Sequence, residues 1–282
     1  MKEYPVFVPH GEDRIAGVVT VPDEEPRGLV VLMAGIGAPR SHRYQIWTRA
    51  ARRLADRGIA SVRWDYRGIG DSSGEIRDWR FGDPAVRDEA ETVARFAMGA
   101  TGLERFVAAG NCLGSYLSLE LAGAMPECVG AVCIRLPLLE PRRGKLRHRA
   151  RGWKLGSVVR SNRAVRRLLQ PLFGKKRRVR GTLQQSFARA LHRGRLLFIY
   201  SAEDYTYRQV VKDKLDRLGR SVPSHLRERY ELRILPEGRL KGFESLPIQE
   251  LVIGSVVEWA DARFPAAAPV GLEGGRAAHG GR

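Results

Sequence analysis

The segment Gly110-Asn-Cys-Leu-Gly114 combines a reactive side chain with the spacing of a tight turn. The apolar run Phe106–Ala109 before it predicts a strand, and Leu113–Met125 after it predicts a helix. So tight a turn leaves room only for small residues two positions before and after its central residue, and glycine meets that requirement. The turn would raise Cys112 above the sheet at a helix N-terminus, which favours a thiolate. The pattern indicates nucleophilic attack by Cys112 on a carbonyl group.

The elements that must position this turn alternate between strands and helices along the chain. Such alternation predicts an α/β protein with a mostly parallel eight-stranded sheet and helices on both faces. The expected strands are Tyr4–Val8, Ile15–Val21, Gly28–Ala34, Ile59–Trp64, Arg105–Ala109, Val129–Ile134, Arg195–Ser201 and Tyr230–Leu235. The expected helices are Gln45–Asp56, Pro84–Met98, Leu113–Met125, Trp153–Gln170, Thr182–Leu191, Tyr207–Leu218 and Leu246–Arg263.

Two further motifs resemble known proteins. Asp65-Tyr-Arg-Gly-Ile-Gly-Asp-Ser72 follows an expected strand and, together with the turn at Cys112, resembles the D-x-R-G-x-G-x-S loop and nucleophile elbow of α/β hydrolases. The segments Ala34–Arg43 and Leu54–Gly58 make the chain similar to exosortase-associated hydrolases, which carry a cysteine at the elbow. The resemblance covers residues 28–125 by motif and the rest by topology only. It implies an α/β-hydrolase fold, a Cys-His-Asp arrangement and a link to surface-polysaccharide export.

The resemblance implies a role for each matching residue. Cys112 would be the nucleophile, and the backbone N–H groups of Leu113 and Ile36 would form the oxyanion hole. The acid is expected directly after the strand Arg195–Ser201, where Asp204 is our choice and Glu203 the alternative.

The family's histidine should follow the last strand, but the loop Pro236–Glu244 contains none. Lys241 stands closest to the expected position. His42 is the histidine nearest to the elbow, and a structural role for it is as compatible with the sequence as a catalytic one. Either residue could supply the cation or base that Cys112 needs, because a cysteine depends less on a strong base than a serine does.

The missing histidine leaves three functions open. The first is a working acyl-transfer hydrolase (an esterase, thioesterase or acyltransferase) with a substituted base. The second is a degenerate hydrolase that binds a ligand, a membrane or a partner without turnover. The third is a scaffold whose basic segment matters more than its pocket. The substrate would be a small-molecule or carrier-bound acyl group.

The net charge of +18 lies in one segment. From Glu140 to Arg195 the chain has 19 basic residues and one acidic residue, and the remainder is neutral. Residues 138–194 stand where hydrolases insert a cap, so we expect a basic helical cap within a hydrolase domain of residues 1–264. Residues 142–195 would face an anionic membrane surface or an acidic carrier protein. Nucleic acid is disfavoured, because few aromatic residues interleave and no known module is present.

The remaining expectations concern location and cofactors. The tail 265–282 is rich in Ala, Gly and Pro and should be disordered. The chain begins without an apolar leader and has no run long enough to span a bilayer, which predicts a cytoplasmic protein that the basic segment could bring to the inner membrane surface. No dinucleotide or phosphate-loop motif occurs, and no cysteine or histidine spacing indicates a metal, so no cofactor is expected. Cys128 and Cys133 are expected to be buried core residues.

Overall fold

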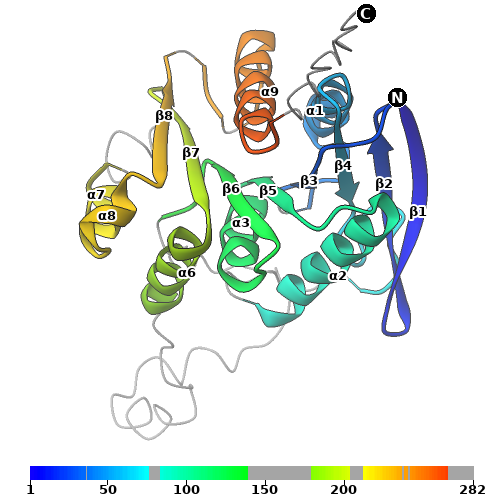
Figure 1. The fold of residues 1–282 in the computed structure, drawn as a ribbon, viewed down its shortest axis with the longest axis horizontal. Coiled ribbons are helices and arrows are strands. Elements are labelled where there is room, and N and C mark those ends of the chain that lie inside the picture. The colour runs from blue at the N-terminus through cyan, green and yellow to red at the C-terminus, as the bar shows by residue number, and fades with distance from the viewer. Residues whose placement is uncertain are drawn as a thin grey trace, which may run out of the picture.

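The computed structural model describes residues 1–35, 37–75, 83–138, 179–203, 212–236, 238–240 and 242–265. Eight strands form one sheet in the order β1-β2-β4-β3-β5-β6-β7-β8 (Figure 1). β2 runs antiparallel to β1 and β4, whereas the pairs from β4 through β8 are parallel. The mostly parallel eight-stranded sheet predicted from the sequence is confirmed.

The element bounds follow the predicted ones within a few residues at each end. The strands are β1 (Lys2–His10), β2 (Asp13–Val21), β3 (Gly28–Met33), β4 (Ile59–Trp64), β5 (Phe106–Asn111), β6 (Cys128–Ile134), β7 (Arg195–Ser201) and β8 (Tyr230–Leu235). The helices are the 3₁₀ turn η1 (Arg43–Gln45), α1 (Ile46–Ala55), α2 (Pro84–Thr101), α3 (Leu113–Ala124), α6 (Val179–Arg193), α7 (Lys212–Arg220), α8 (Ser224–Arg227) and α9 (Leu246–Asp261). The short α8 was not predicted.

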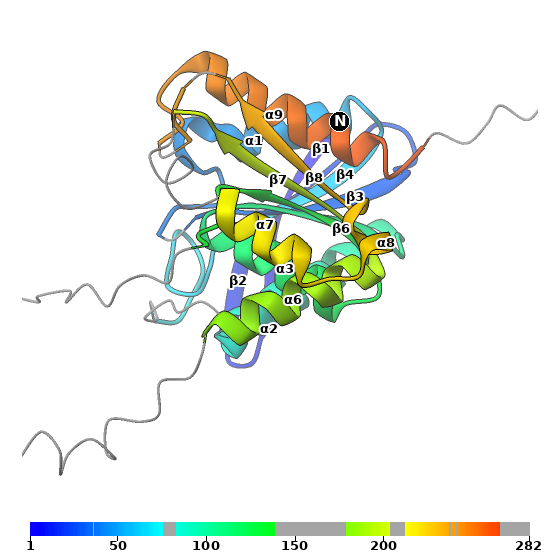
Figure 2. The ribbon, with the colours of Figure 1, turned by 90° about the vertical axis from the view of Figure 1, so that its left-hand side faces the viewer.

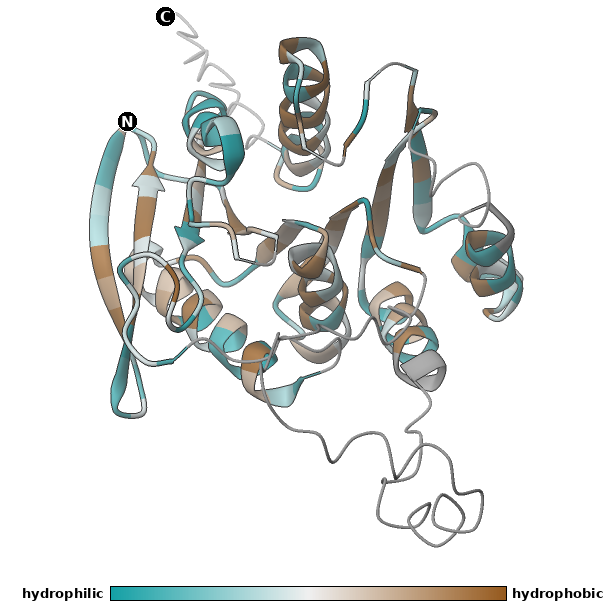
Figure 3. Cartoon of the chain, turned by 180° about the vertical axis from the view of Figure 1, so that it is seen from behind, coloured by the Kyte–Doolittle hydropathy of each residue, from teal (hydrophilic) through white to brown (hydrophobic). Residues whose placement is uncertain are grey.

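Helices cover both faces of the sheet. α1 and α9 pack together on one face, and α2, α3 and α6 lie on the other (Figure 2). Every residue of β3, β4 and β5 is buried, which explains their nearly unbroken apolar sequences. The outer helices, such as α7, in contrast carry both hydrophobic and hydrophilic residues (Figure 3). The core therefore lies in two layers, one on each side of the central strands.

The strand order creates a topological switch point between β3 and β5. The chain leaves β3 through α1 toward β4, and it leaves β5 through α3 toward β6, so the connections depart over opposite faces and in opposite directions. In open α/β sheets, ligands bind at such a switch point, beyond the carboxyl ends of the strands. The loop after β3 and the turn after β5, which carries Cys112, meet at this point.

The segment expected to form the cap is described only in part. The predicted helix Thr182–Leu191 is present as α6, and it packs against α3 with Phe187 fully buried. α6 thus belongs to the helical layer beneath the sheet. The rest of the cap prediction, including the helix Trp153–Gln170, lies outside the described residues, as do nearly all of the predicted tail and the start of the predicted helix Tyr207–Leu218. Within the described ranges, no helix has the length and hydropathy to cross a membrane.

Candidate active site

The turn at Cys112 has the backbone of a nucleophile elbow. Cys112 adopts φ 55° and ψ −111°, and α3 begins at the next residue. A Cβ atom on Gly110 would lie 2.2 Å from the carbonyl carbon of Gly114, and one on Gly114 would lie 2.3 Å from the oxygen of Met33. Both glycines are therefore required by close backbone approach, as the spacing predicted. Holding a non-glycine residue at positive φ costs free energy, and residues strained in this way cluster at functional sites.

The Cys112 side chain is half-buried and its backbone is firmly held. Its N–H donates to the Ile134 oxygen at 3.1 Å, and the Ser115 hydroxyl donates to its carbonyl at 2.5 Å. Burial raises the pKa of the thiol, while a hydrogen bond from the Leu113 N–H and the charge of Arg135 lower it by less. The thiolate expected from the helix N-terminus is thus not the resting form. Desolvation outweighs the helix end, and Cys112 is a thiol at neutral pH.

Arg135 is a cation beside the elbow that the sequence had not singled out. β6 pairs with β5 so that Ile134 lies opposite Asn111, and Arg135 follows at the same sheet edge. Its backbone has φ 51° and donates to the oxygen of Ile199 at 2.8 Å. Its charge favours the thiolate of Cys112. The sequence does show an arginine directly after the expected strand Val129–Ile134. It could be placed near Cys112 only once the order of the strands in the sheet was known.

His42 lies next to the elbow with both ring nitrogens engaged. Its Nδ1 accepts the N–H of Arg43 at 2.7 Å, and its Nε2 lies 3.1 Å from the Asn111 side-chain amide. Because Nδ1 accepts, the neutral ring carries its proton on Nε2, and Asn111 should present its oxygen, not its nitrogen, to that proton. Burial lowers the pKa of His42 to about 4. At neutral pH the ring is an uncharged donor with no free nitrogen.

Aromatic packing fixes the same ring. His42 meets Trp47 and Phe243 edge to face, with ring centroids 6.0 and 5.3 Å away. Phe243 belongs to the loop after β8, where the resemblance led us to expect a histidine, and its carbonyl accepts from Gln249 at 2.7 Å. These contacts favour the structural role of His42 over the catalytic one, both of which the sequence left open.

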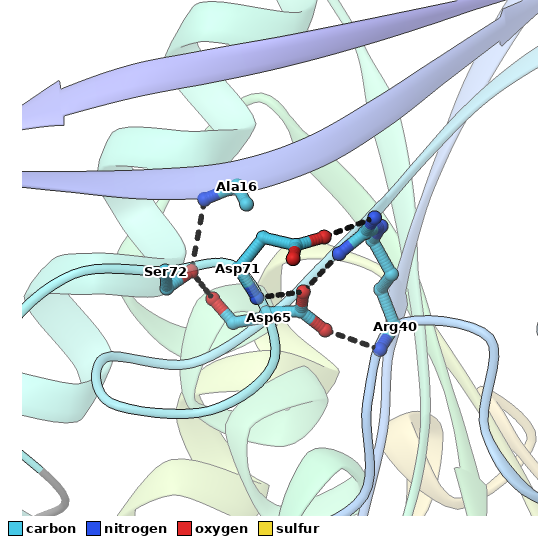
Figure 4. Close-up of polar contacts among 5 residues, drawn as sticks. All are labelled: Ala16, Arg40, Asp65, Asp71 and Ser72. Atoms are coloured by element: carbon cyan, nitrogen blue, oxygen red, sulfur yellow. Dashed lines mark hydrogen bonds and ion pairs between the residues drawn. The ribbon is translucent and has the colours of Figure 1, made fainter.

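An ion-pair cluster built on one buried carboxylate joins the loop after β3 to the loop after β4 (Figure 4). The Asp65 carboxylate is fully buried and binds both the backbone N–H of Arg40, at 2.5 Å, and the Arg40 guanidinium. Arg40 also pairs with Asp71 at 2.7 Å. Ser72 donates to the Asp65 carbonyl and accepts from the N–H of Ala16. The D-x-R-G-x-G-x-S motif therefore acts as a brace for the loop that would carry an oxyanion-hole residue.

The structure brings together only part of the predicted site. Leu113 is the first residue of α3, and its N–H donates to the Cys112 sulfur. Glu203 is exposed and accepts from the Gly238 N–H at 3.0 Å, which links two loops. Three other predicted site residues lie outside the described residues: Ile36, Asp204 and Lys241. Among the residues that the structure describes, no three His, Cys, Asp or Glu side chains form a group that could hold a metal ion.

One family model and many solved structures match the chain. A family described as serine aminopeptidase, S33, matches residues 24–197. No curated protein sequence matches the chain. Similar solved structures include the esterase Pf2001 of Pyrococcus furiosus, with 15% identity, 94% of each chain covered and a TM-score of 0.63. A dienelactone hydrolase of Anabaena variabilis has 17% identity, covers 94% of this chain and 99% of its own, and has a TM-score of 0.62. Est1E of Butyrivibrio proteoclasticus, bound to ferulic acid, has 14% identity, 90% and 97% coverage, and a TM-score of 0.61.

These matches confirm the α/β-hydrolase fold predicted from the two loop motifs. The narrower similarity to exosortase-associated hydrolases stays a prediction. The family's description names a serine enzyme, whereas the elbow of this chain carries Cys112.

Proposed function

We propose that this chain, which belongs to the serine aminopeptidase S33 family of hydrolases, cleaves ester or thioester bonds through an acyl intermediate on Cys112. The observation that carries the proposal is the backbone of Cys112, held at φ 55° and ψ −111° at the start of α3 with its side chain only half-buried. The elbow places a sulfur at the sheet's switch point, next to a helix-end N–H group.

The chemistry has two steps. In acylation, the Cys112 sulfur bonds to the carbonyl carbon, the carbon–oxygen or carbon–sulfur bond to the leaving group breaks, and the thiol proton passes to the departing alcohol or thiol. In deacylation, water adds to the thioester, the acid leaves, and a proton returns to the sulfur. We assign the Leu113 N–H, and with it the Ile36 N–H, to the oxyanion of both tetrahedral intermediates.

The two steps make unequal demands on a base. Arg135 supports the sulfur as it loses its proton, so acylation can proceed at pH values approaching the thiol pKa. Deacylation needs a group that activates water, and His42 is committed to Arg43 and Asn111. Lys241 and Asp204 are our candidates for this task. We expect acylation to be faster than deacylation.

The test is pre-steady-state kinetics with a chromogenic ester and with an acyl thioester. The proposal predicts a burst of leaving group stoichiometric with enzyme, followed by slower turnover. Cys112→Ala should abolish both phases. Cys128→Ala is the matched control, because Cys128 is fully buried in β6, and this variant should keep the burst. A burst that survives in Cys112→Ala would refute the proposal.

A ligand-binding protein without turnover is the second candidate. One observation favours it: the described part of the loop after β8 places Phe243 against His42, and the whole loop lacks the histidine that the resemblance implies. Under this alternative, neither the ester nor the thioester gives a burst, whereas a carboxylic acid of the same acyl group still binds.

The acyl group would be presented by an acidic carrier protein or at an anionic membrane in the cytoplasm. The concentration of positive charge in residues 142–195 supports this part of the proposal. Binding to vesicles of anionic lipid should weaken steeply with added salt, because screening shortens the reach of the charges. Binding that is insensitive to salt would contradict it.

A further inference from the structure

Four arginines surround a hollow at the sheet edge opposite Cys112. The hollow has a volume of about 360 Å³ and is lined by Arg193, Arg195, Arg229 and Arg263, together with Val129, Gly194 and Ala262. β5 through β8 are parallel, so the starts of β6 and β7 lie at the edge away from the end of β5, where the elbow stands. We call this site the arginine hollow.

No ion pair neutralises the arginines of the hollow within the described part of the chain, although the charge of Glu231 acts on Arg263. None of its four arginines forms an ion pair there, and the acidic residues nearby are engaged elsewhere. Glu231 binds Arg233 at 3.1 Å, and Asp261 binds Arg27 and Arg57. The hollow therefore has a high positive potential that an anion would relieve.

Two of the guanidinium groups are anchored by carbonyls at helix ends. Arg193 donates to the Ala124 oxygen at 3.0 Å, and Arg229 donates through Nη1 to the oxygens of Leu191 and His192 at 3.3 Å. Each of these bonds uses one nitrogen of a group that carries five N–H donors. An anchored guanidinium loses less entropy on binding a ligand than a free one.

Arg263 is held differently. Its guanidinium stacks on the Trp259 ring at 4.5 Å, and its buried Nε has no hydrogen-bond partner. Burial and the nearby charge of Arg195 lower the pKa of Arg263, and the charge of Glu231 opposes them in part. Because Nε is enclosed, the terminal nitrogens of Arg263, which lines the hollow next to the like charge of Arg195, are the donors left for an anionic oxygen.

We infer that the arginine hollow binds a small anion carrying two or more phosphate groups. Guanidinium groups match phosphate oxygens in pairs, and four of them exceed the need of a single phosphate. The volume suits a small metabolite and is at the low end for ligand pockets. The site is independent of acyl chemistry at Cys112, since it stands at the other sheet edge.

The test is calorimetric titration of the full chain with inorganic pyrophosphate at physiological ionic strength. Arg195→Gln and Arg263→Gln should each weaken binding about tenfold or more, as loss of a charged hydrogen bond predicts. Arg220→Gln, at the exposed end of α7 and outside the hollow, is the matched control and should leave binding unchanged. Cys112→Ala should also bind normally, which separates this result from the fate of the proposed activity. A nucleoside diphosphate arm shows whether the source is a nucleotide, which then binds more tightly than pyrophosphate.

A second measurement needs no variant. In the wild-type chain, pyrophosphate should protect Arg195 and Arg263 from an arginine-directed reagent, read by peptide mass, while Arg220 stays reactive. Equal losses in all three arginine variants, uniform protection, or binding of polymeric nucleic acid without binding of pyrophosphate would overturn the inference. Each outcome would mean that the net charge of +18 attracts anions without a built site.

Discussion

His42 Nε2 lies 3.1 Å from the side-chain amide of Asn111, the residue that immediately precedes Cys112. His42 is thus hydrogen-bonded to the residue next to the candidate nucleophile. Its other nitrogen accepts from the Arg43 backbone, and two aromatic rings enclose it. We therefore expect the ring to support the turn and another group to transfer protons.

The first prediction concerns His42→Gln. The folded pKa of about 4 lies below the ordinary value of 6.5, so the unfolded chain binds the extra proton between these pH values. The free energy of unfolding should therefore rise with pH from 4 to 6.5, by on the order of 3 kcal/mol from this group. Urea unfolding of His42→Gln should show a flatter rise over that window. If Cys112 acylation also disappeared in a folded variant, the structural role would be wrong.

Glu120 gives a pH effect of the opposite sign. Its carboxyl on α3 is 6% exposed, Oε2 has no hydrogen-bond partner, and burial raises the pKa from 4.5 to about 7. The folded chain thus holds the extra proton between pH 4.5 and 7, and stability falls as pH rises through that range. Glu120→Gln should be more stable than wild type above pH 7, by up to about 3 kcal/mol.

The measurement is urea unfolding at pH 5 and pH 8. Glu228→Gln, an exposed control, should change stability little. A Glu120→Gln variant that is less stable than wild type at pH 8 would show that the ionised carboxylate is stabilising.

The third prediction concerns Arg135 and the sulfur. Removing the charge in Arg135→Gln should raise the pKa of Cys112 further, so alkylation of the thiol at pH 8 slows and its pH profile moves upward. Arg135→Lys should restore much of the rate. In both variants, Cys128 and Cys133 should react only on unfolding, because both are fully buried. An unchanged Cys112 profile in Arg135→Gln would remove Arg135 from the site.

The fourth prediction compares two carboxylates that bind the same arginine. Asp65 is fully buried, and Asp65→Asn should lower the free energy of unfolding by about 3 kcal/mol, since it leaves Arg40 without its buried partner. Asp71 has a side chain that is 64% exposed, and Asp71→Asn should cost only about 0.5 kcal/mol. Equal costs in urea unfolding would mean that the brace between the two loops is not what stabilises them.

The sequence predicted those features that short-range patterns determine. Buried strands such as β3 and β4 appear as apolar runs, and the turn at Cys112 is recognisable because Gly110 and Gly114 are forced by close backbone contact. The protonation state of Cys112 was harder to predict. A helix N-terminus suggested a thiolate at Cys112, but the protonation state depends on how much of the sulfur is buried, which only the packed structure gives.

Residues that meet across the sheet could not be found from the sequence. Arg135 is next to Cys112 only because β6 pairs with β5, and Phe243 reaches His42 only because the loop after β8 folds back over the switch point. The four arginines of the arginine hollow come from three separate parts of the chain. Ile36, Asp204 and Lys241 stay predictions.

The most direct test of the account is the mass of the intact chain after brief exposure to an activated acyl ester. The account predicts one added acyl group, mapped to the peptide that contains Cys112 and absent from Cys112→Ala, with slow loss on standing. An adduct on any other residue, or no adduct while the ester is still hydrolysed, would contradict a cysteine nucleophile at this elbow.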